Sequence, residues 1–370
     1  MADNWEFASQ YARGQYVGVL IDKTVLMPSA LQVVSELASG NQPEIVSWWN
    51  DNYYPTNEAA GYDVGTYIPA YRPCQPEQFD PAAELRRRFR MDVRRGQEGK
   101  HYFWGKICFG VYHRDLIARI KSRIGRLFFP LSPDYTSMLA ALGVAKSAFD
   151  LGRPLLMSFV SQLSNGATAA RDPAFAKNFY MQIDPGVIGR LPLPGLYASN
   201  HNGVAYDYVQ IQQKLGEQLG SLQLNRDNLI LRAMEDLEQQ QWTEESERLE
   251  QEAILAAHLN TIGTGVLARY KLDRLAQEAS RFQHSVQFFP TVRRLFRPLG
   301  RRYPKFKKFT KTLLLEQNQH AWKPQNRYAW EHRRHFSSIV EAAEAADSHY
   351  NRELAGVASA RAYSRDGAGS

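Results

Sequence analysis

The apolar and polar positions in the first half of the chain predict alternating helices and strands. We expect helices over 2–13, 28–39 and 81 to about 95, further helices beginning at Arg114 and Asp134, and strands over 16–21, 44–49 and 106–112. Residues 50–79 are rich in Pro, Gly, Asn and Tyr, which predicts a long surface loop. Such alternation indicates an α/β fold with a mixed sheet and flanking helices over residues 1–150.

The second half of the chain has a different character. Gly, Pro and Asn punctuate residues 152–205, which predicts a loop-rich extension over 151–205. Ile230, Met234 and Leu237 then follow helical spacing, so residues 206–285 are expected to be largely helical, with an acidic solvated face over 235–252. Basic amphipathic helices and a C-terminal helix are expected over 286–354, and a disordered tail over 355–370.

A candidate ligand site lies at the end of the predicted strand 16–21. Asp22 follows this apolar run, Lys23 comes next, and Pro28 opens the following helical pattern. Open α/β sheets bind ligands at the carboxyl ends of buried parallel strands, so a carboxylate at this place is a candidate for binding. The alternative is a buried strand with a chance polar end.

Two segments together resemble family 2 glycosyltransferases of the GT-A fold. They are QYVGVLIDKTVLMPSA (15–30) and GRLFFPLSPDYTSMLAAL (125–142), and they have the order and spacing of that family. The resemblance covers about residues 1–145. It implies a partial GT-A-like sheet and transfer of a sugar from a nucleotide-sugar donor to a saccharide or lipid-linked acceptor. It further implies polysaccharide or glycolipid synthesis by a cytoplasmic protein at the inner face of the plasma membrane.

The resemblance has two departures at the donor site. Aligned with the family, the two aspartates of its metal-binding motif fall on Ile21 and Lys23, so Asp22 alone is acidic. A Mg²⁺ or Mn²⁺ ion on the diphosphate would then have one carboxylate ligand; Lys23 could replace its charge or could be a surface lysine. The chain also begins where the family is halfway through its nucleotide-binding domain, so we expect a shortened product with an impaired donor site. A non-catalytic binding or scaffold protein on the same fold is the alternative.

The resemblance assigns further residues to the chemistry of the acceptor. Asp134, at a predicted helix start, occupies the place of the base that takes the acceptor's proton; plain N-capping would also explain an aspartate there. The family segment near the acceptor corresponds to the strand over 106–112. Its candidate acceptor-binding residues, with one from the end of strand 44–49, are Trp104, Lys106, His113, Arg114 and Trp49.

Charge and cysteine usage bound the remaining functions. The net charge of +7 is concentrated in residues 286–315, where the expected membrane-surface residues are Arg293, Arg294, Arg297, Arg301, Arg302, Lys305, Lys307 and Lys308. These short basic helices would bind an anionic membrane surface, or pack on the protein with a solvated basic face. No nucleic-acid-binding motif accompanies them, so no nucleic-acid partner is expected. Cys74 and Cys108 lack metal-site spacing and are expected to be free thiols.

Overall fold

The computed structural model describes residues 1–40, 42–55, 63–91, 99–160, 165–219, 221–268, 270–271, 328–329 and 331–366. The chain divides into two compact units. The first comprises Met1–Tyr67, Pro73–Thr261 and Arg334–Ser370, and the second comprises Ile68–Arg72 and Ile262–Arg333. The sheet and the candidate site belong to the first unit. The basic stretch 286–315 lies outside the described residues.

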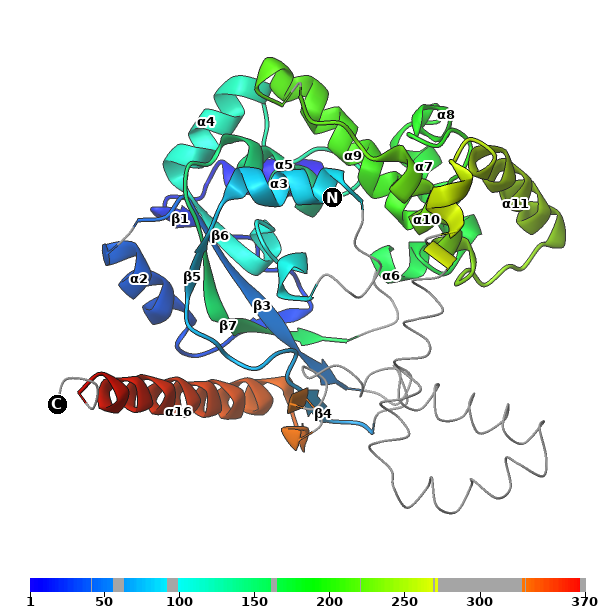
Figure 1. Ribbon diagram of the computed structural model, residues 1–370. Coiled ribbons are helices and arrows are strands. Elements are labelled where there is room, and N and C mark those ends of the chain that lie inside the picture. Colours follow the sequence, from blue (N-terminus) through cyan, green and yellow to red (C-terminus); the bar gives the residue numbers. More distant parts are fainter. Residues whose placement is uncertain are drawn as a thin grey trace, which may run out of the picture. The chain divides into compact units, whose positions relative to one another are not determined.

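A mixed sheet, with eight strands among the described residues, is at the centre of the first unit (Figure 1). The strands are β1 (Tyr16–Val17), β2 (Thr24–Leu26), β3 (Ile45–Tyr54), β4 (Thr66–Ile68), β5 (Glu77–Phe79), β6 (Gly110–His113), β7 (Ala148–Phe159) and β8 (Arg334–His335). The order β1-β6-β3-β4-β8 forms one path, and β7 pairs with β3 and carries β2 and β5. β3 and β7 run parallel, whereas β1–β6, β3–β6, β2–β7, β5–β7 and β4–β8 are antiparallel. The predicted α/β class with a mixed sheet is therefore confirmed.

Helices flank the sheet and continue into a helical region. They are α1 (Ala2–Ser9), α2 (Ala30–Gly40), α3 (Pro81–Phe89), α4 (Arg114–Ile124), α5 (Pro133–Val144), α6 (Asn165–Ala169), α7 (Pro173–Ile183), α8 (Val187–Arg190), α9 (Asn200–Leu215), α10 (Arg226–Leu237), α11 (Glu245–Leu259) and α16 (Ile339–Asp366). Short 3₁₀ turns are η1 (Gly99–Tyr102), η2 (Ile107–Phe109) and η3 (Gly216–Leu219). α5 packs against α3, α4 and α9, and Figure 1 shows α3, α4 and α5 on one side of the sheet and α16 on the other. In the described part of the chain, no helix combines the length and apolar character needed to cross a membrane.

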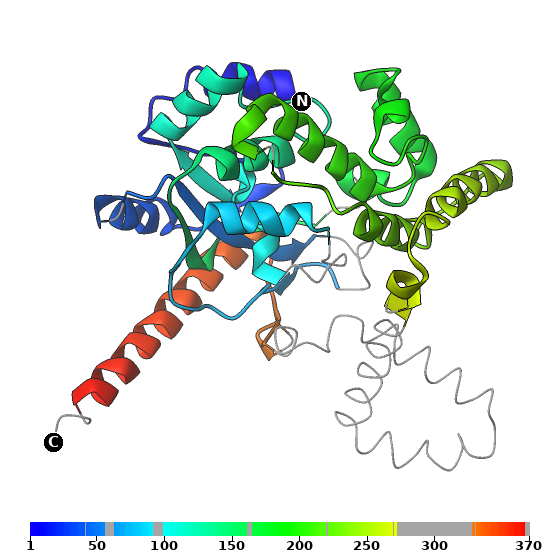
Figure 2. The same ribbon diagram turned by 45° about the horizontal axis from the view of Figure 1, so that its top comes forward.

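The long C-terminal helix is fixed to the sheet by an apolar patch and a buried ion pair. Its alanines and Tyr350 pack with Tyr53 and Met157. Asp347, on the same helix, accepts hydrogen bonds from the Ser29 hydroxyl at 2.5 Å and from Arg153 at 2.9 Å. Ser29 directly precedes α2, and Arg153 lies in β7. These contacts therefore connect α16 to the start of α2 and to β7. Figure 2 shows α16 beginning near the sheet and extending away from it towards the C-terminus.

The strand predicted over 16–21 is wrong beyond its first residues. β1 has two half-buried residues, lies at the edge of the sheet, and is antiparallel to β6. Glycine permits an unusually close approach here, since a Cβ on Gly18 would lie 2.9 Å from the Gly110 carbonyl oxygen. The next amide, of Val19, then donates to Ile107 in η2 rather than to a neighbouring strand. Asp22 consequently lies in a turn before β2, not at the carboxyl end of a buried parallel strand.

The prediction that a loop-rich extension begins at 151 is also wrong. β7 runs through Ala148–Phe159 and pairs with three other strands. Gly152 and Pro154 resemble loop punctuation in the sequence, but the register between β3 and β7 shifts between Ser47 and Asn50, and this irregularity accommodates them. Gly152 has φ +66°, as expected of a glycine at an irregularity in a strand. The loop predicted over 50–79 likewise contains the end of β3, with β4 and β5.

Other boundaries were predicted with mixed success. Asp80 caps α3 as expected, accepting from the Ala82 amide at 2.9 Å. α4 begins at Arg114 and α5 at Pro133, next to the predicted start. α1 ends at Ser9 rather than at residue 13, and α3 at Phe89 rather than near 95. α6, α7 and α8 lie within the expected loop-rich region, and α16 continues to Asp366 through most of the expected tail.

Candidate functional site

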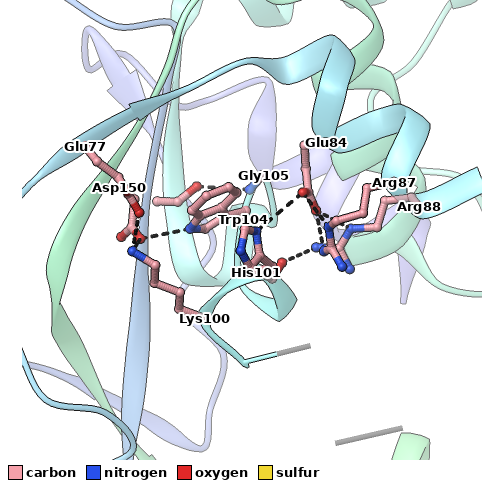
Figure 3. A network of polar contacts seen from close by, with 10 residues as sticks. Glu77, Glu84, Arg87, Arg88, Lys100, His101, Trp104, Gly105 and Asp150 are labelled. Atoms are coloured by element: carbon pink, nitrogen blue, oxygen red, sulfur yellow. Dashed lines mark hydrogen bonds and ion pairs between the residues drawn. The ribbon is translucent and has the colours of Figure 1, made fainter. Parts of the chain in front are cut away.

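A short segment before β6, residues 99–106, is held in place by two polar clusters, the first of which is centred on Glu84 (Figure 3). The Glu84 side chain is 2% exposed and accepts from Arg87 Nε at 2.8 Å and from Arg88 Nε at 2.7 Å. Arg88 also donates to the carbonyl of His101 in the segment. Burial would raise the pKa of Glu84, but the hydrogen bond from Arg87, the His101 ring with its Nδ1 3.7 Å away, and the arginine charges outweigh it and lower that pKa to about 2. Glu84 is therefore an ionised link between α3 and the segment.

The second cluster is centred on Asp150 of β7. Its Oδ2 accepts from Trp104 Nε1 at 2.9 Å and lies 3.6 Å from Lys100 Nζ, while its Oδ1 accepts from the Gly152 amide at 3.0 Å. Lys100 also pairs with Glu77 of β5, and Figure 3 shows its ammonium group between the two carboxylates. Burial raises the pKa of Asp150 despite these contacts. The segment is thus attached to the sheet as well as to α3.

Gly105 directs the end of the segment. Its φ is +79°, its amide donates to Ser47 Oγ at 2.9 Å, and its carbonyl accepts from the Tyr112 hydroxyl. A Cβ at this position would lie 3.1 Å from Leu142 and 3.2 Å from Met138 of α5. The close approach and the left-handed backbone both require glycine, and they fix the direction in which Lys106 leaves the segment.

Lys106 is a fully buried cation beside Asp134. Its Nζ lies 3.6 Å from Asp134 Oδ2, 3.6 Å from the centre of the Tyr102 ring and 3.8 Å from that of Tyr135. Across the parts of the chain that the structure describes, no acceptor hydrogen-bonds this ammonium group. Aromatic faces and a carboxylate each offset part of the cost of burying a positive charge. Lys106 was predicted to bind the acceptor, but it contacts the candidate catalytic carboxylate instead.

Asp134 occupies the first turn of α5 and remains open to solvent. Ser132 is the N-cap residue of this helix, and the Asp134 side chain is 29% exposed. Asp134 is therefore not the capping residue that the alternative interpretation required. Its carboxylate meets the Lys106 ammonium and is also partly open to solvent, so a bound molecule can reach it.

Asp207 lies behind Asp134 and was not identified from the sequence. It is 1% exposed on α9, is hydrogen-bonded by Ser132, and its Oδ2 meets no partner among the residues that the structure describes. Burial, with the nearby charge of Asp134, raises the pKa of Asp207 well above its usual value. Asp207 is thus enclosed by the protein, whereas Asp134 is partly open to solvent. In the sequence, the only sign of Asp207 is that its carboxyl falls on a helix face that is otherwise formed by the apolar residues Val204, Tyr208 and Ile211.

Two predicted acceptor-binding residues lie away from this site. His113 ends β6, caps α4 by accepting from the Asp115 amide at 3.2 Å, and contacts the Tyr16 ring edge-on. Arg114 is exposed, and its amide donates to the Gln15 carbonyl at 2.8 Å. Both therefore lie beside β1, beyond the end of β6 that is farther from Lys106.

The two predicted tryptophans have no ring face open to a ligand. Trp49 is 1% exposed on β3. Trp104 is 8% exposed, and its ring stacks on Phe79 with centres 4.3 Å apart while its Nε1 bonds Asp150. In this conformation both indoles are part of the protein core and neither presents a platform for a sugar.

The predicted donor residues lie in the turn before β2. Asp22 is exposed, and the Lys23 carbonyl accepts from the Phe159 amide at 2.7 Å. Hard cations require several oxygen ligands. Within the described ranges, Asp22 belongs to no group of three His, Cys, Asp or Glu side chains that could converge on an ion. At this turn Asp22 would give a Mg²⁺ or Mn²⁺ ion one carboxylate, and a bound diphosphate would have to supply further oxygen ligands.

No protein-family model matches the chain, and no curated protein sequence matches it. The structure brings together Asp134 and Lys106 from the predicted residues, and adds Tyr102, Tyr135 and Asp207. The predicted membrane-surface residues between 293 and 308 lie outside the described residues.

Proposed function

We propose that this chain is a glycosyltransferase in which Asp134 accepts a proton from the acceptor hydroxyl. The observation that carries the proposal is the pairing of a partly exposed Asp134 with a fully buried Lys106, 3.6 Å away. The resemblance of residues 15–30 and 125–142 to family 2 glycosyltransferases supports the same assignment. The donor would be a nucleotide sugar, and the acceptor a saccharide or a lipid-linked saccharide.

The proposed reaction displaces a diphosphate from the sugar. The acceptor oxygen forms a bond to the anomeric carbon, the bond between that carbon and the diphosphate oxygen breaks, and the nucleoside diphosphate leaves with the electron pair. Asp134 takes the hydroxyl proton as the new bond forms, which makes the oxygen a better nucleophile. Its exposed oxygen can afterwards release the proton to water.

Lys106 has a supporting role in this proposal. Its ammonium lies between two tyrosine rings and cannot reach solvent, so its charge acts at short range on Asp134. Electrostatic groups that are fixed before the reaction need no reorganisation during it. Lys106 would therefore hold the Asp134 carboxylate in one orientation between turnovers.

The donor diphosphate needs positive charge, which the turn at 22–23 supplies without a metal cage. Lys23 is half-buried there, next to the exposed Asp22. An ammonium group can stabilise a leaving diphosphate as a point charge. We propose this role for Lys23, with metal-independent binding as its consequence.

A single carboxylate at the donor turn also favours a second candidate function. A protein on this fold that binds saccharides or a partner without transferring sugar would need neither a metal cage nor a general base. The two functions differ in the use of Asp134: the scaffold tolerates its loss, and the transferase does not.

The proposed location is the inner face of the plasma membrane, through the basic stretch 286–315. Each basic side chain near an anionic surface contributes about 1 kcal/mol. Sedimentation with anionic but not neutral vesicles, reversed by high salt, is the expected result.

A donor panel tests the proposed function. The full chain is incubated with radiolabelled nucleotide sugars, with and without saccharide acceptors and Mn²⁺, and released nucleoside diphosphate is measured. We expect acceptor-dependent release from at least one donor that persists in a chelator. Binding of saccharides without any release would instead favour the scaffold.

A further inference from the structure

An apolar cavity of about 400 Å³ lies between α2 and residues 15–20, over the sheet. Leu31 and Val34 line it from α2, Val19 and Leu20 from the segment before β2, and Trp48 and Leu156 from the sheet. Its volume falls within the range of small-molecule sites, about 300–1,000 Å³.

The lining residues carry no charged side chain. The polar or weakly polar groups are those of Gln15, Tyr16, Ser35 and Cys108 and the indole N–H of Trp48, which is buried without a hydrogen-bond partner in the described part of the chain; the rest are apolar or glycine. Leu31 is 76% exposed and Leu20 is 55% exposed, so large apolar side chains meet water at this cavity. A ligand that covered them would gain the free energy of removing apolar surface from water.

The chemistry of the lining selects the occupant. A polypeptide would bring N–H and C=O groups that each need a partner, and the lining offers few. The nearby backbone is also engaged, since the Val19 amide already donates to Ile107. A hydrocarbon chain brings no polar group and can fill the space without leaving one unpaired.

Cys108 is one of the residues that line the cavity. This buried residue lies in η2, which directly follows Lys106 in the chain.

We propose that this cavity binds the hydrocarbon chain of an amphiphilic molecule. This inference names a lipid-linked saccharide as the acceptor class of the proposed transfer, and rests on the proposed function for that role alone. Chain binding itself requires no catalysis, so it can be measured separately.

Quenching of tryptophan fluorescence tests the proposal on the full chain. The probe is an alkyl maltoside with a brominated chain, used below its micelle concentration, because bromine quenches an indole that it contacts. Trp48 lines the cavity and supplies the signal, and Trp48→Phe identifies its share among the seven tryptophans. We expect saturable quenching in the wild type that is lost in Trp48→Phe.

A matched pair of exposed leucines gives the decisive comparison. Leu31→Glu introduces a charge at the cavity, whereas Leu249→Glu makes the same change on α11, where the leucine is 54% exposed. Since each 1.4 kcal/mol is a factor of ten, we expect Leu31→Glu to weaken probe binding about tenfold or more, and Leu249→Glu to leave it unchanged.

Three results would overturn the inference: no saturable quenching, equal quenching in Trp48→Phe, or equal affinity in Leu31→Glu. A dimer that Leu31→Glu dissociates, with no quenching, would assign the cavity to a polypeptide and also overturn it. The proposed function fails separately, if the chain binds the probe but releases no nucleoside diphosphate from any donor.

Discussion

Glu84 and Asp134 are two carboxylates beside the segment 99–106, and their surroundings differ. Glu84 is 2% exposed and contacts Arg87, Arg88 and His101. Asp134 is 29% exposed and contacts one buried cation, Lys106. The first carboxylate has its bonding capacity filled by the protein, whereas the second keeps an oxygen open to a ligand.

The comparison separates a structural role from a chemical one. A carboxylate enclosed by cations fixes the chain, because its loss removes a negative charge from beside a buried arginine. A carboxylate with one buried cation and one open side can exchange a proton with a bound molecule. We therefore expect the two residues to differ in how their loss affects stability and activity.

The largest expected effect on stability follows from Glu84→Gln. The variant keeps the size of the side chain but removes the carboxylate charge 2.7 Å from Arg88, whose side chain is 6% exposed. We expect a loss of about 3–5 kcal/mol in the free energy of unfolding, measured by urea at pH 7. Asp22→Asn, at an exposed carboxylate in the turn before β2, is the control and should cost less than about 1 kcal/mol. Similar losses in both variants would remove the distinction.

The pH dependence of stability sharpens the same contrast. Glu84 has a pKa of about 2 in the folded protein against an ordinary value of 4.5. Its contribution, about 3 kcal/mol, is therefore complete above pH 4.5 and is lost as the pH falls towards 2. The difference in unfolding free energy between wild type and Glu84→Gln should shrink over that window. A constant difference from pH 7 to pH 3 would contradict the assignment.

A smaller effect is expected from the glycine that directs Lys106. Gly105→Ala places a Cβ at φ +79° and within 3.2 Å of α5, so we expect a loss of about 1–3 kcal/mol in thermal or urea unfolding. Gly125→Ala is the matched control, because Gly125 has φ +83° but open space around its Cα. It should lose only the backbone part, about 1 kcal/mol. Equal losses would show that the contact with α5 carries no cost.

The smallest effect on stability is expected from Lys106→Met. A methionine keeps the volume between the tyrosine rings and removes a buried charge, so the unfolding free energy should change by less than about 1 kcal/mol. Turnover should nevertheless fall about tenfold, because Asp134 loses the group that orients it. The comparison is a variant at an exposed residue, either Asp172 or a surface lysine such as Lys146, for which turnover should not change. A stable variant with unchanged turnover would leave Lys106 without a catalytic role.

The sequence predicts the parts of this site that depend on local signals. Asp80 before Pro81 predicts the start of α3, and Pro133 predicts the start of α5 beside Asp134. Lys106 and Asp134 were both singled out, but their contact depends on Gly105 and on the clusters at Glu84 and Asp150. Those are long-range contacts, which no periodicity of a single segment encodes.

The two errors in the sheet have a common physical reason. The apolar run 16–21 has the composition of a buried strand, yet the approach of Gly18 to Gly110 diverts its backbone from the ladder. β7 contains Gly152 and Pro154, which normally end strands, yet an irregularity in its pairing with β3 absorbs them. In both cases packing against a neighbour, rather than local preference, determined the strand.

The central claim is that Asp134 is the base for sugar transfer, and one variant tests it most directly. Transfer by Asp134→Asn is compared with transfer by Asp172→Asn, since Asp172 caps α7 and has only that structural role in the described contacts. We expect Asp134→Asn to reduce turnover by about 10²-fold or more with donor binding unchanged, and Asp172→Asn to retain turnover. Full turnover by Asp134→Asn would contradict the claim.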